Sequence, residues 1–253
     1  IYHIGARTDT FLQDEATFHE LNLAYSQKLW TLATTYQIPF FYASSAATYG
    51  DGSQGFSDDE KQLPLLQPLN AYARSKHAFD LWAIAQPHKP PRWAGFKFFN
   101  VYGPNEYHKG AMSSVAYRGL LQILQENELR LFRSYRPEYK DGEQKRDFIY
   151  VKDVVDVLYF FLVEEVPSGI YNLGTGKAET FLELGEALFR ALGRPVRIRF
   201  IDMPEVIREK YQYFTEADMR KLRSVGYARP FHSVRDGIEA YVRGYLYPER
   251  RYW

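Results

Sequence analysis

Cysteine is absent from the 253-residue sequence. Its absence excludes disulfides, thiolate-bound metal and a cysteine nucleophile, and it agrees with a reducing compartment such as the cytoplasm, where we expect the protein. The six histidines are scattered without the spacing of metal ligands, so we expect no metal site. Runs of apolar residues long enough to span a bilayer are also missing. Lys and Arg number 32 against 31 Asp and Glu, so the charge gives no reason to expect a nucleic acid or a membrane as partner.

Short apolar segments alternate along the chain with segments of helical periodicity. Ile38–Ser45, Trp93–Asn100 and Gly169–Gly174 have the composition of buried strands, whereas Leu21–Tyr36 and Tyr72–Ala85 have the spacing of helices. In the first of these helices the apolar side is expected to contain Leu21, Leu29, Leu32 and Ala33. The alternation predicts an α/β fold, in which a parallel sheet is connected by crossover helices.

The residues with the clearest chemistry are Tyr72 and Lys76. Four positions apart, they share one face of the predicted helix. An ammonium beside a phenol favours the phenolate, so we expect Lys76 to lower the pKa of Tyr72 from its usual value near 10, as a general acid/base requires. Ser45 ends the preceding predicted strand, where its hydroxyl can bind the same substrate oxygen. In a chain with 21 tyrosines, a Tyr and a Lys four positions apart also arise by chance as an exposed pair on a helix. The position of Ser45 at the end of the preceding predicted strand is what favours a catalytic role for the pair.

Five motifs in one order resemble the extended short-chain dehydrogenases that act on nucleotide sugars. They cover essentially the whole chain and are Ser44–Gly50, Tyr72–Lys76, Phe99–Pro104, Arg146–Val151 and Tyr171–Gly176. The resemblance implies a partial Rossmann-like sheet domain, residues 1–103 and 147–178, and a smaller mixed α/β substrate domain, residues 104–146 and 179–253.

Three further stretches are similar to the ADP-glyceromanno-heptose 6-epimerases within that group. They are His3–Thr10, His108–Ala116 and Tyr211–Asp218. This similarity implies a bound NADP, an ADP-heptose substrate, a product used in the lipopolysaccharide core and a homo-oligomer.

Inversion at C6 of the heptose requires that a C–H bond break, so NADP would take a hydride and return it to the other face. Tyr72 is the first of the two acid/base groups, and the resemblance assigns Lys109 as the second. A desolvated lysine can have a pKa low enough to act near neutral pH, which makes this role chemically plausible. Lys76 would orient Tyr72 and bind the nicotinamide ribose, and Ser45 would polarise the carbonyl. The implied cofactor contacts are Ile4, Gly5, Ala6, Arg7, Thr8, Asn22, Lys76 and Val101. The implied substrate contacts are Asn100, Lys109, Ala111, Arg118, Phe132, Arg146 and Tyr211.

Two positions depart from the family pattern. Ala111 stands where a serine is usual and Arg118 where a histidine is common, and both changes leave the exact nucleotide sugar open.

The glycine-rich turn Gly-x-Gly-x-x-Gly, with which such folds hold a dinucleotide, is missing. Gly174 and Gly176 stand too late in the chain to supply it. We therefore expect that roughly 65 residues precede Ile1 in the parent protein, at about 30 per βαβ unit. For the chain alone we expect weak or absent NADP binding.

Two alternative functions remain at this point. A sibling enzyme such as a UDP-hexose 4-epimerase shares most of the motifs, although His108-Lys109-Gly110 argues against it; a dehydratase is disfavoured because Ala46-Ala47-Thr48 replaces its acidic pair. The other alternative is a non-catalytic remnant or scaffold that has kept the fold, since folds do not fix functions and the cofactor glycine motif is absent.

Overall fold

The computed structural model describes residues 1–10, 12–208 and 211–247 and contains two compact units. Unit 1 consists of Ile1–Phe99, Val163–Leu173 and Ala217–Tyr227, and unit 2 of Asn100–Leu162, Gly174–Glu216 and Ala228–Trp253. Both units are discontinuous in sequence. Their bounds differ from those of the expected functional domains, chiefly because residues 147–162 belong to unit 2 and residues 217–227 to unit 1.

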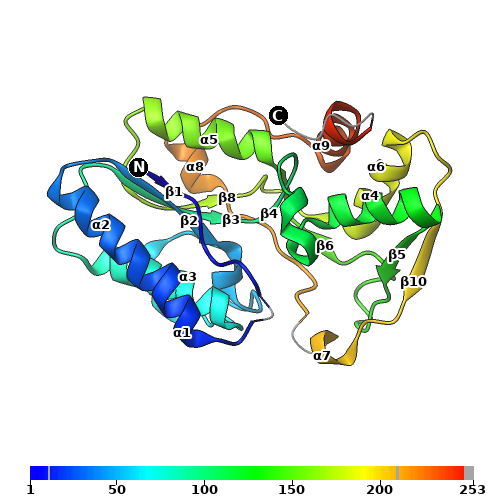
Figure 1. Cartoon of the computed structure of the whole chain (residues 1–253), viewed down its shortest axis with the longest axis horizontal. Helices are drawn as coiled ribbons and strands as arrows, with labels where there is room; N and C mark the ends of the chain where they lie inside the picture. The colour runs from blue at the N-terminus through cyan, green and yellow to red at the C-terminus, as the bar shows by residue number, and fades with distance from the viewer. Residues whose placement is uncertain (11, 209–210, 248–253) are drawn as a thin grey trace. The chain divides into compact units, whose positions relative to one another are not determined.

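Unit 1 contains a four-stranded parallel sheet in the order β1-β2-β3-β8 (Figure 1). Its strands are β1 (Tyr2–His3), β2 (Phe40–Ser45), β3 (Trp93–Phe98) and β8 (Gly169–Leu173). All residues of β2 and β8 are buried, which explains why apolar residues predominate in both strands. The register pairs Ser45 with Phe98 and Phe98 with Leu173, so the carboxyl ends of three strands align. The predicted α/β fold with a parallel sheet is confirmed.

The helices of unit 1 include α2 (Tyr25–Thr35), which packs on this sheet through an aromatic side chain. They are α1 (Glu15–Phe18), η1 (His19–Ala24), α2 (Tyr25–Thr35), η2 (Ala46–Tyr49), η3 (Glu60–Leu65), α3 (Ala71–Ala85) and α8 (Arg220–Ser224). Trp30 of α2 is fully buried and meets the rings of Phe40 and Trp93 edge-on. The expected apolar side of this helix is wrong in part, since Leu21 and Leu32 are exposed. Trp30, which the aliphatic pattern did not include, fills the core instead.

Helix α3 begins and ends where local chemistry dictates. The Asn70 side chain accepts a hydrogen bond from the Ala73 N–H at 2.8 Å and caps its first turn. Gln86 has extended backbone angles, as expected of a residue before a proline, and ends the helix. The predicted helix over Tyr72–Ala85 is thus confirmed.

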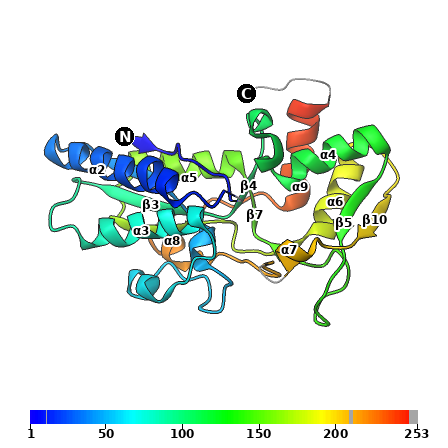
Figure 2. The same cartoon turned by 60° about the horizontal axis from the view of Figure 1, so that its bottom comes forward.

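Unit 2 combines short strand pairs with a helical core (Figure 2). The strands are β4 (Asn100–Tyr102) with β7 (Phe148–Tyr150), β5 (Leu129–Phe132) with β10 (Ile198–Ile201), and β6 (Lys145–Arg146) with β9 (Glu179–Thr180). The helices are η4 (Tyr107–Met112), α4 (Val115–Glu126), α5 (Val151–Val163), α6 (Phe181–Ala191), α7 (Glu205–Arg208), α9 (Val234–Tyr241) and η5 (Val242–Leu246). Helices α4, α6 and α9 and strand β5 contribute Ile123, Leu129, Leu188 and Ile238 to one apolar core. Within the described ranges, every helix is too short or too polar to cross a membrane.

Gly237 of α9 allows close approach of a buried tyrosine. A Cβ atom at this position would lie 2.0 Å from the hydroxyl oxygen of Tyr102 and 3.3 Å from Cβ of Tyr150. Tyr102 is itself buried, so its ring has no solvent into which to move. The glycine is therefore a packing requirement of unit 2.

We predict that Gly237→Ala lowers the free energy of unfolding by about 1–3 kcal/mol, because the added methyl group overpacks the contact with Tyr102. Urea denaturation followed by circular dichroism would measure the loss. The matched control is Gly244→Ala in η5, where a Cβ would meet nothing within 4 Å. Alanine there is expected to be neutral or to stabilise by up to about 1 kcal/mol. Equal effects of the two substitutions would contradict the packing argument.

Candidate active site

The structure brings Ser45, Tyr72 and Lys76 together in unit 1. Ser45 is the last residue of β2, and Tyr72 is the second residue of α3, which packs on that strand. The Ser45 and Tyr72 side chains form a hydrogen bond. Lys76, one turn further along α3, is buried and donates from Nζ to the carbonyl oxygen of Ala43 at 2.8 Å. Tyr72 is only partly buried, so this arrangement has one accessible member.

The electrostatics of this group differ from the sequence-based expectation. Burial raises the pKa of Tyr72, the Ser45 hydrogen bond lowers it and the Asp80 carboxylate raises it, with a net shift upward. The expected lowering of the Tyr72 pKa is therefore wrong for this structure. The reason is desolvation, which disfavours the charged forms of both Tyr72 and Lys76. It also lowers the pKa of Lys76 to about 8, against an opposing effect of Asp80.

Asn22 connects the loop after β1 to α3. Its Oδ1 accepts from the Arg7 N–H at 2.8 Å, and its Nδ2 donates to the Arg7 carbonyl at 3.0 Å and to Ser75 Oγ at 3.0 Å. Both amide hydrogens are thereby used, and the side chain is buried. Asn22 fixes the loop beside the residue that precedes Lys76, which suits a positioning role.

The loop Ile4–Thr8 lies at the edge of the sheet where a dinucleotide is expected to bind. It leaves the carboxyl end of a parallel strand, which is where open α/β sheets bind nucleotides. Ile4 is 39% exposed, and a Cβ at Gly5 would meet nothing within 4 Å, so ligand atoms have room to approach the backbone. The backbone of this loop therefore leaves room for a nicotinamide dinucleotide beside it. His3 behind the loop stays neutral because burial and Lys76 lower its pKa to about 4.

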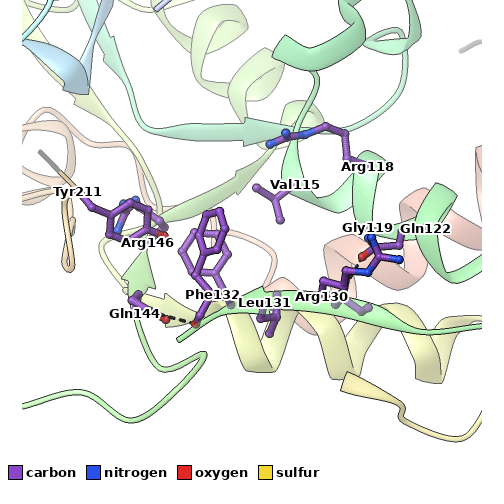
Figure 3. Close-up of a pocket in the computed structure, with 12 residues that line it drawn as sticks. Val115, Arg118, Gly119, Gln122, Arg130, Leu131, Phe132, Gln144, Arg146 and Tyr211 are labelled. Carbon is purple, nitrogen blue, oxygen red and sulfur yellow. Dashed lines mark hydrogen bonds between the residues drawn. The ribbon is translucent and has the colours of Figure 1, made fainter. Parts of the chain in front are cut away.

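A cavity of about 360 Å³ lies within unit 2 (Figure 3). That size is at the lower end of the range for small-molecule sites. The Arg146 guanidinium is buried and lies 5.1 Å from the centroid of the Tyr211 ring, which meets Phe132 edge-on. Burial lowers the pKa of Arg146. Figure 3 shows Arg118 across the cavity from Arg146 and Tyr211.

Four of the predicted substrate residues thus line one cavity: Arg118, Phe132, Arg146 and Tyr211. Sequence reasoning missed Arg130, Gln122, Gln144 and Val115, which line it too. Arg130 could have been found from the alternation along β5, which puts positions 130 and 132 on one face. The Arg130 guanidinium pairs with Glu126, which offsets its charge.

Lys109, Ala111 and Asn100 are exposed in unit 2, and Val101 of β4 is partly buried. The desolvation that the sequence argument assumed for Lys109 is therefore not present. Tyr72 belongs to unit 1 and Lys109 to unit 2, so their cooperation stays a prediction.

Glu106 holds the segment that carries Lys109, and sequence reasoning missed it. Its buried carboxylate accepts from the N–H of Ser114 at 2.5 Å, from Ser114 Oγ at 2.8 Å and from the N–H of Gly103 at 3.3 Å. An acidic residue within the motif Gly103-Pro104-Asn105-Glu106 gave no local signal of burial.

Comparison with known proteins agrees with this geometry. The family model described as the NAD dependent epimerase/dehydratase family matches residues 1–174. The chain belongs to the NAD dependent epimerase/dehydratase family. Two relatives are named ADP-L-glycero-D-manno-heptose-6-epimerase. The one from Fusobacterium nucleatum is 46% identical over 100% of this chain and 78% of its own length. The one from Nitratidesulfovibrio vulgaris is 51% identical over 97% of this chain and 76% of its own.

Among solved structures, the ADP-L-glycero-D-manno-heptose-6-epimerase of Helicobacter pylori is similar with a TM-score of 0.81. It is 26% identical, and the match covers 96% of this chain and 71% of that one. The predicted resemblance to the extended family of nucleotide-sugar epimerases is confirmed, and with it the prediction of an isomerase.

We predict that Arg146→Met weakens binding of a nucleoside diphosphate, ADP or UDP, by about 1.5–3 kcal/mol, roughly tenfold or more. The planar guanidinium can bind diphosphate oxygens in pairs, and methionine fills the space without that ability. Isothermal titration calorimetry on the folded variant would measure the change.

Arg136→Met is the control for this substitution. Arg136 also stacks on a tyrosine, 4.6 Å from the centroid of Tyr213, but it is exposed and lies outside the residues that line the cavity. The two variants lose the same charge, so equal losses of affinity would argue that the cavity is not the diphosphate site.

Proposed function

We propose that this protein inverts the configuration at C6 of the heptose in an ADP-glyceromanno-heptose and so supplies a precursor of the lipopolysaccharide core. The observation that carries the proposal is the meeting of Ser45, Tyr72 and Lys76 at the end of β2. That group supports reversible oxidation of a carbinol. The 51% identity over 97% of the chain to an enzyme of this activity supports the heptose as its substrate.

The chemistry that a bound nicotinamide supplies is reversible hydride transfer at C6. We propose NADP as the cofactor, held by the backbone of Ile4–Thr8, by Lys76 and by Val101, with Asn22 fixing the loop. The support is the exposed loop at the carboxyl end of β1.

The chain's own residues handle the proton. Tyr72 Oη exchanges the proton with the C6 oxygen in one of the two half-reactions, while Ser45 Oγ donates a hydrogen bond to that substrate oxygen. Lys76 supports the phenolate that forms, because an ammonium stabilises a neighbouring anion. The upward-shifted pKa of Tyr72 favours its role as proton donor to the carbonyl oxygen.

During inversion the substrate presents first one face of C6 and then the other to the nicotinamide. A second acid/base group, on the side of C6 opposite Tyr72, is therefore needed. We propose Lys109 for that role. Its exposure leaves the ammonium accessible to substrate, and Glu106 fixes the segment on which it stands.

The cavity of unit 2 suits the nucleotide. We propose that Arg146 and Arg118 bind the diphosphate and that Phe132 and Tyr211 contact the base or sugar, with Asn100 and Ala111 as further substrate contacts. The presence of these two arginines and two aromatic rings on one cavity of this size supports the assignment. We propose a cytoplasmic homo-oligomer as the form in which the enzyme acts.

We predict that the protein converts ADP-glyceromanno-heptose between its C6 epimers and leaves UDP-glucose unchanged. In deuterated water the product should carry no deuterium at C6, because the hydride that leaves is the one that returns. Chromatography and mass spectrometry would show both results. Turnover of UDP-glucose instead would favour a 4-epimerase.

Tyr72→Phe is expected to lower kcat by about 10²–10⁴-fold, since it removes the acid/base hydroxyl. The control is Tyr36→Phe, which changes a tyrosine that is 69% exposed at the end of α2. If Tyr72→Phe kept full activity, a binding or scaffold role for the fold would be favoured over catalysis.

A further inference from the structure

A fully buried ion pair lies beneath the proposed catalytic group of unit 1 and takes no part in the mechanism above. Lys97 of β3 and Asp80 of α3 both have no solvent exposure, and the distance from Lys97 Nζ to Asp80 Oδ2 is 2.7 Å. Burying two charges costs free energy that their mutual attraction does not always offset, and apolar residues of similar volume often serve a core as well. The pair therefore calls for an explanation other than stability.

Every polar atom of the pair has a partner. The Asp80 carboxylate accepts from Lys97, from Ser44 Oγ at 2.6 Å and from Tyr42 Oη at 3.0 Å. Lys97 Nζ also donates to Thr48 Oγ1 at 2.6 Å and lies 5.1 Å from the centroid of the Tyr49 ring. The pair thus connects α3 with β2, β3 and η2 by directional bonds.

Asp80 continues the catalytic face of α3. Tyr72, Lys76 and Asp80 follow one another at intervals of four residues, so they lie on one side of the helix. Tyr72 is partly exposed at its first turn, Lys76 is buried in the middle and Asp80 is fully buried below. Lys76 already bonds to β2 at Ala43.

We propose that Asp80 and Lys97 are positioning residues for Tyr72 and Lys76: they fix this face of α3 to β2 and β3, and their opposite charges balance each other beside the catalytic lysine. The proposal rests on the function proposed above for Tyr72 and Lys76.

The Asp80 charge acts on both catalytic groups. The carboxylate raises the pKa of Lys76, and it also raises that of Tyr72. The other titratable groups that interact with Lys76 or with Asp80 come from several elements. They are His3 of β1, Tyr42 of β2, Tyr49 of η2, His77 of α3 and Lys97 of β3. Burial lowers the pKa of both histidines and raises that of both tyrosines, so these four stay neutral near pH 7.

These charges predict the direction in which each substitution shifts the pKa of Lys76. Asp80→Asn removes an anion and leaves Lys97 unbalanced, so the pKa of Lys76 should fall by about one unit. Lys97→Met leaves the Asp80 carboxylate unbalanced, so that pKa should rise by a similar amount. In the double variant both charges are gone, and the pKa should return to within about 0.3 units of the wild-type value.

The test is a pH titration of Lys76 in the full chain by NMR of ¹³Cε-labelled lysine, with the resonance assigned by its loss in Lys76→Met. This readout needs no substrate, so it stands whether or not the proposed activity is found. Opposite shifts in the single variants and cancellation in the double variant are the expected result. A pair that serves packing alone would leave the Lys76 titration unmoved in all three, and that result would overturn the proposal.

The single variants each leave a buried charge unpaired and can fail to fold, so Ser44→Ala provides an independent variant. It removes one donor from the Asp80 carboxylate while both charges stay paired. The less neutralised carboxylate should raise the pKa of Lys76 by a few tenths of a unit. An unchanged titration in Ser44→Ala would count against the proposal. In assays of the active enzyme, the apparent pKa in the pH profile of kcat/KM should shift in the same direction as the Lys76 pKa measured by NMR. A structural defect would instead lower activity at all pH values without shifting that apparent pKa.

Discussion

The hydrogen bond from Lys76 Nζ to the carbonyl oxygen of Ala43 sets the position of α3 on the sheet, and the candidate site depends on it. A lysine that donates to a strand carbonyl must lie within a side-chain length of that strand. Because α3 is regular, this fixes Tyr72 one turn above, beside Ser45, and Asp80 one turn below, beside Lys97. This contact, together with the Asp80–Lys97 pair, therefore determines where the phenol, the ammonium and the buried carboxylate lie relative to β2.

Local patterns in the sequence were enough to predict this arrangement in outline. The strand that ends at Ser45 and the helix from Tyr72 to Ala85 follow from composition, from helical spacing and from a proline at position 87, all of which act over a few residues. The group Ser45, Tyr72 and Lys76 was predicted for the same reason, since helical spacing and a strand end are local properties.

Features that depend on tertiary burial were not predictable in the same way. The direction of the Tyr72 pKa shift was wrong because desolvation outweighs a neighbouring charge, and desolvation is decided by packing from distant segments. The exposed Leu21 and Leu32 and the buried Trp30 show the same limit. Glu106 and Asp80 are acidic residues whose burial becomes intelligible only when their partners at Ser114 and Lys97 are known.

Reaction type and substrate depend on different parts of the chain. In the proposed function, the oxidation chemistry depends on the Ser45, Tyr72 and Lys76 group of unit 1, whereas nucleotide binding depends on the cavity of unit 2. Arg118 and Ala111, which depart from the family pattern, belong to unit 2 and leave the first group untouched. An enzyme divided in this way can change its substrate through residues such as Arg118 while Lys76 keeps its environment. The environment of Lys76 is kept constant by Asn22 on one side and by the Asp80–Lys97 pair on the other. Directional bonds to buried groups constrain the position of a side chain more narrowly than apolar contacts do.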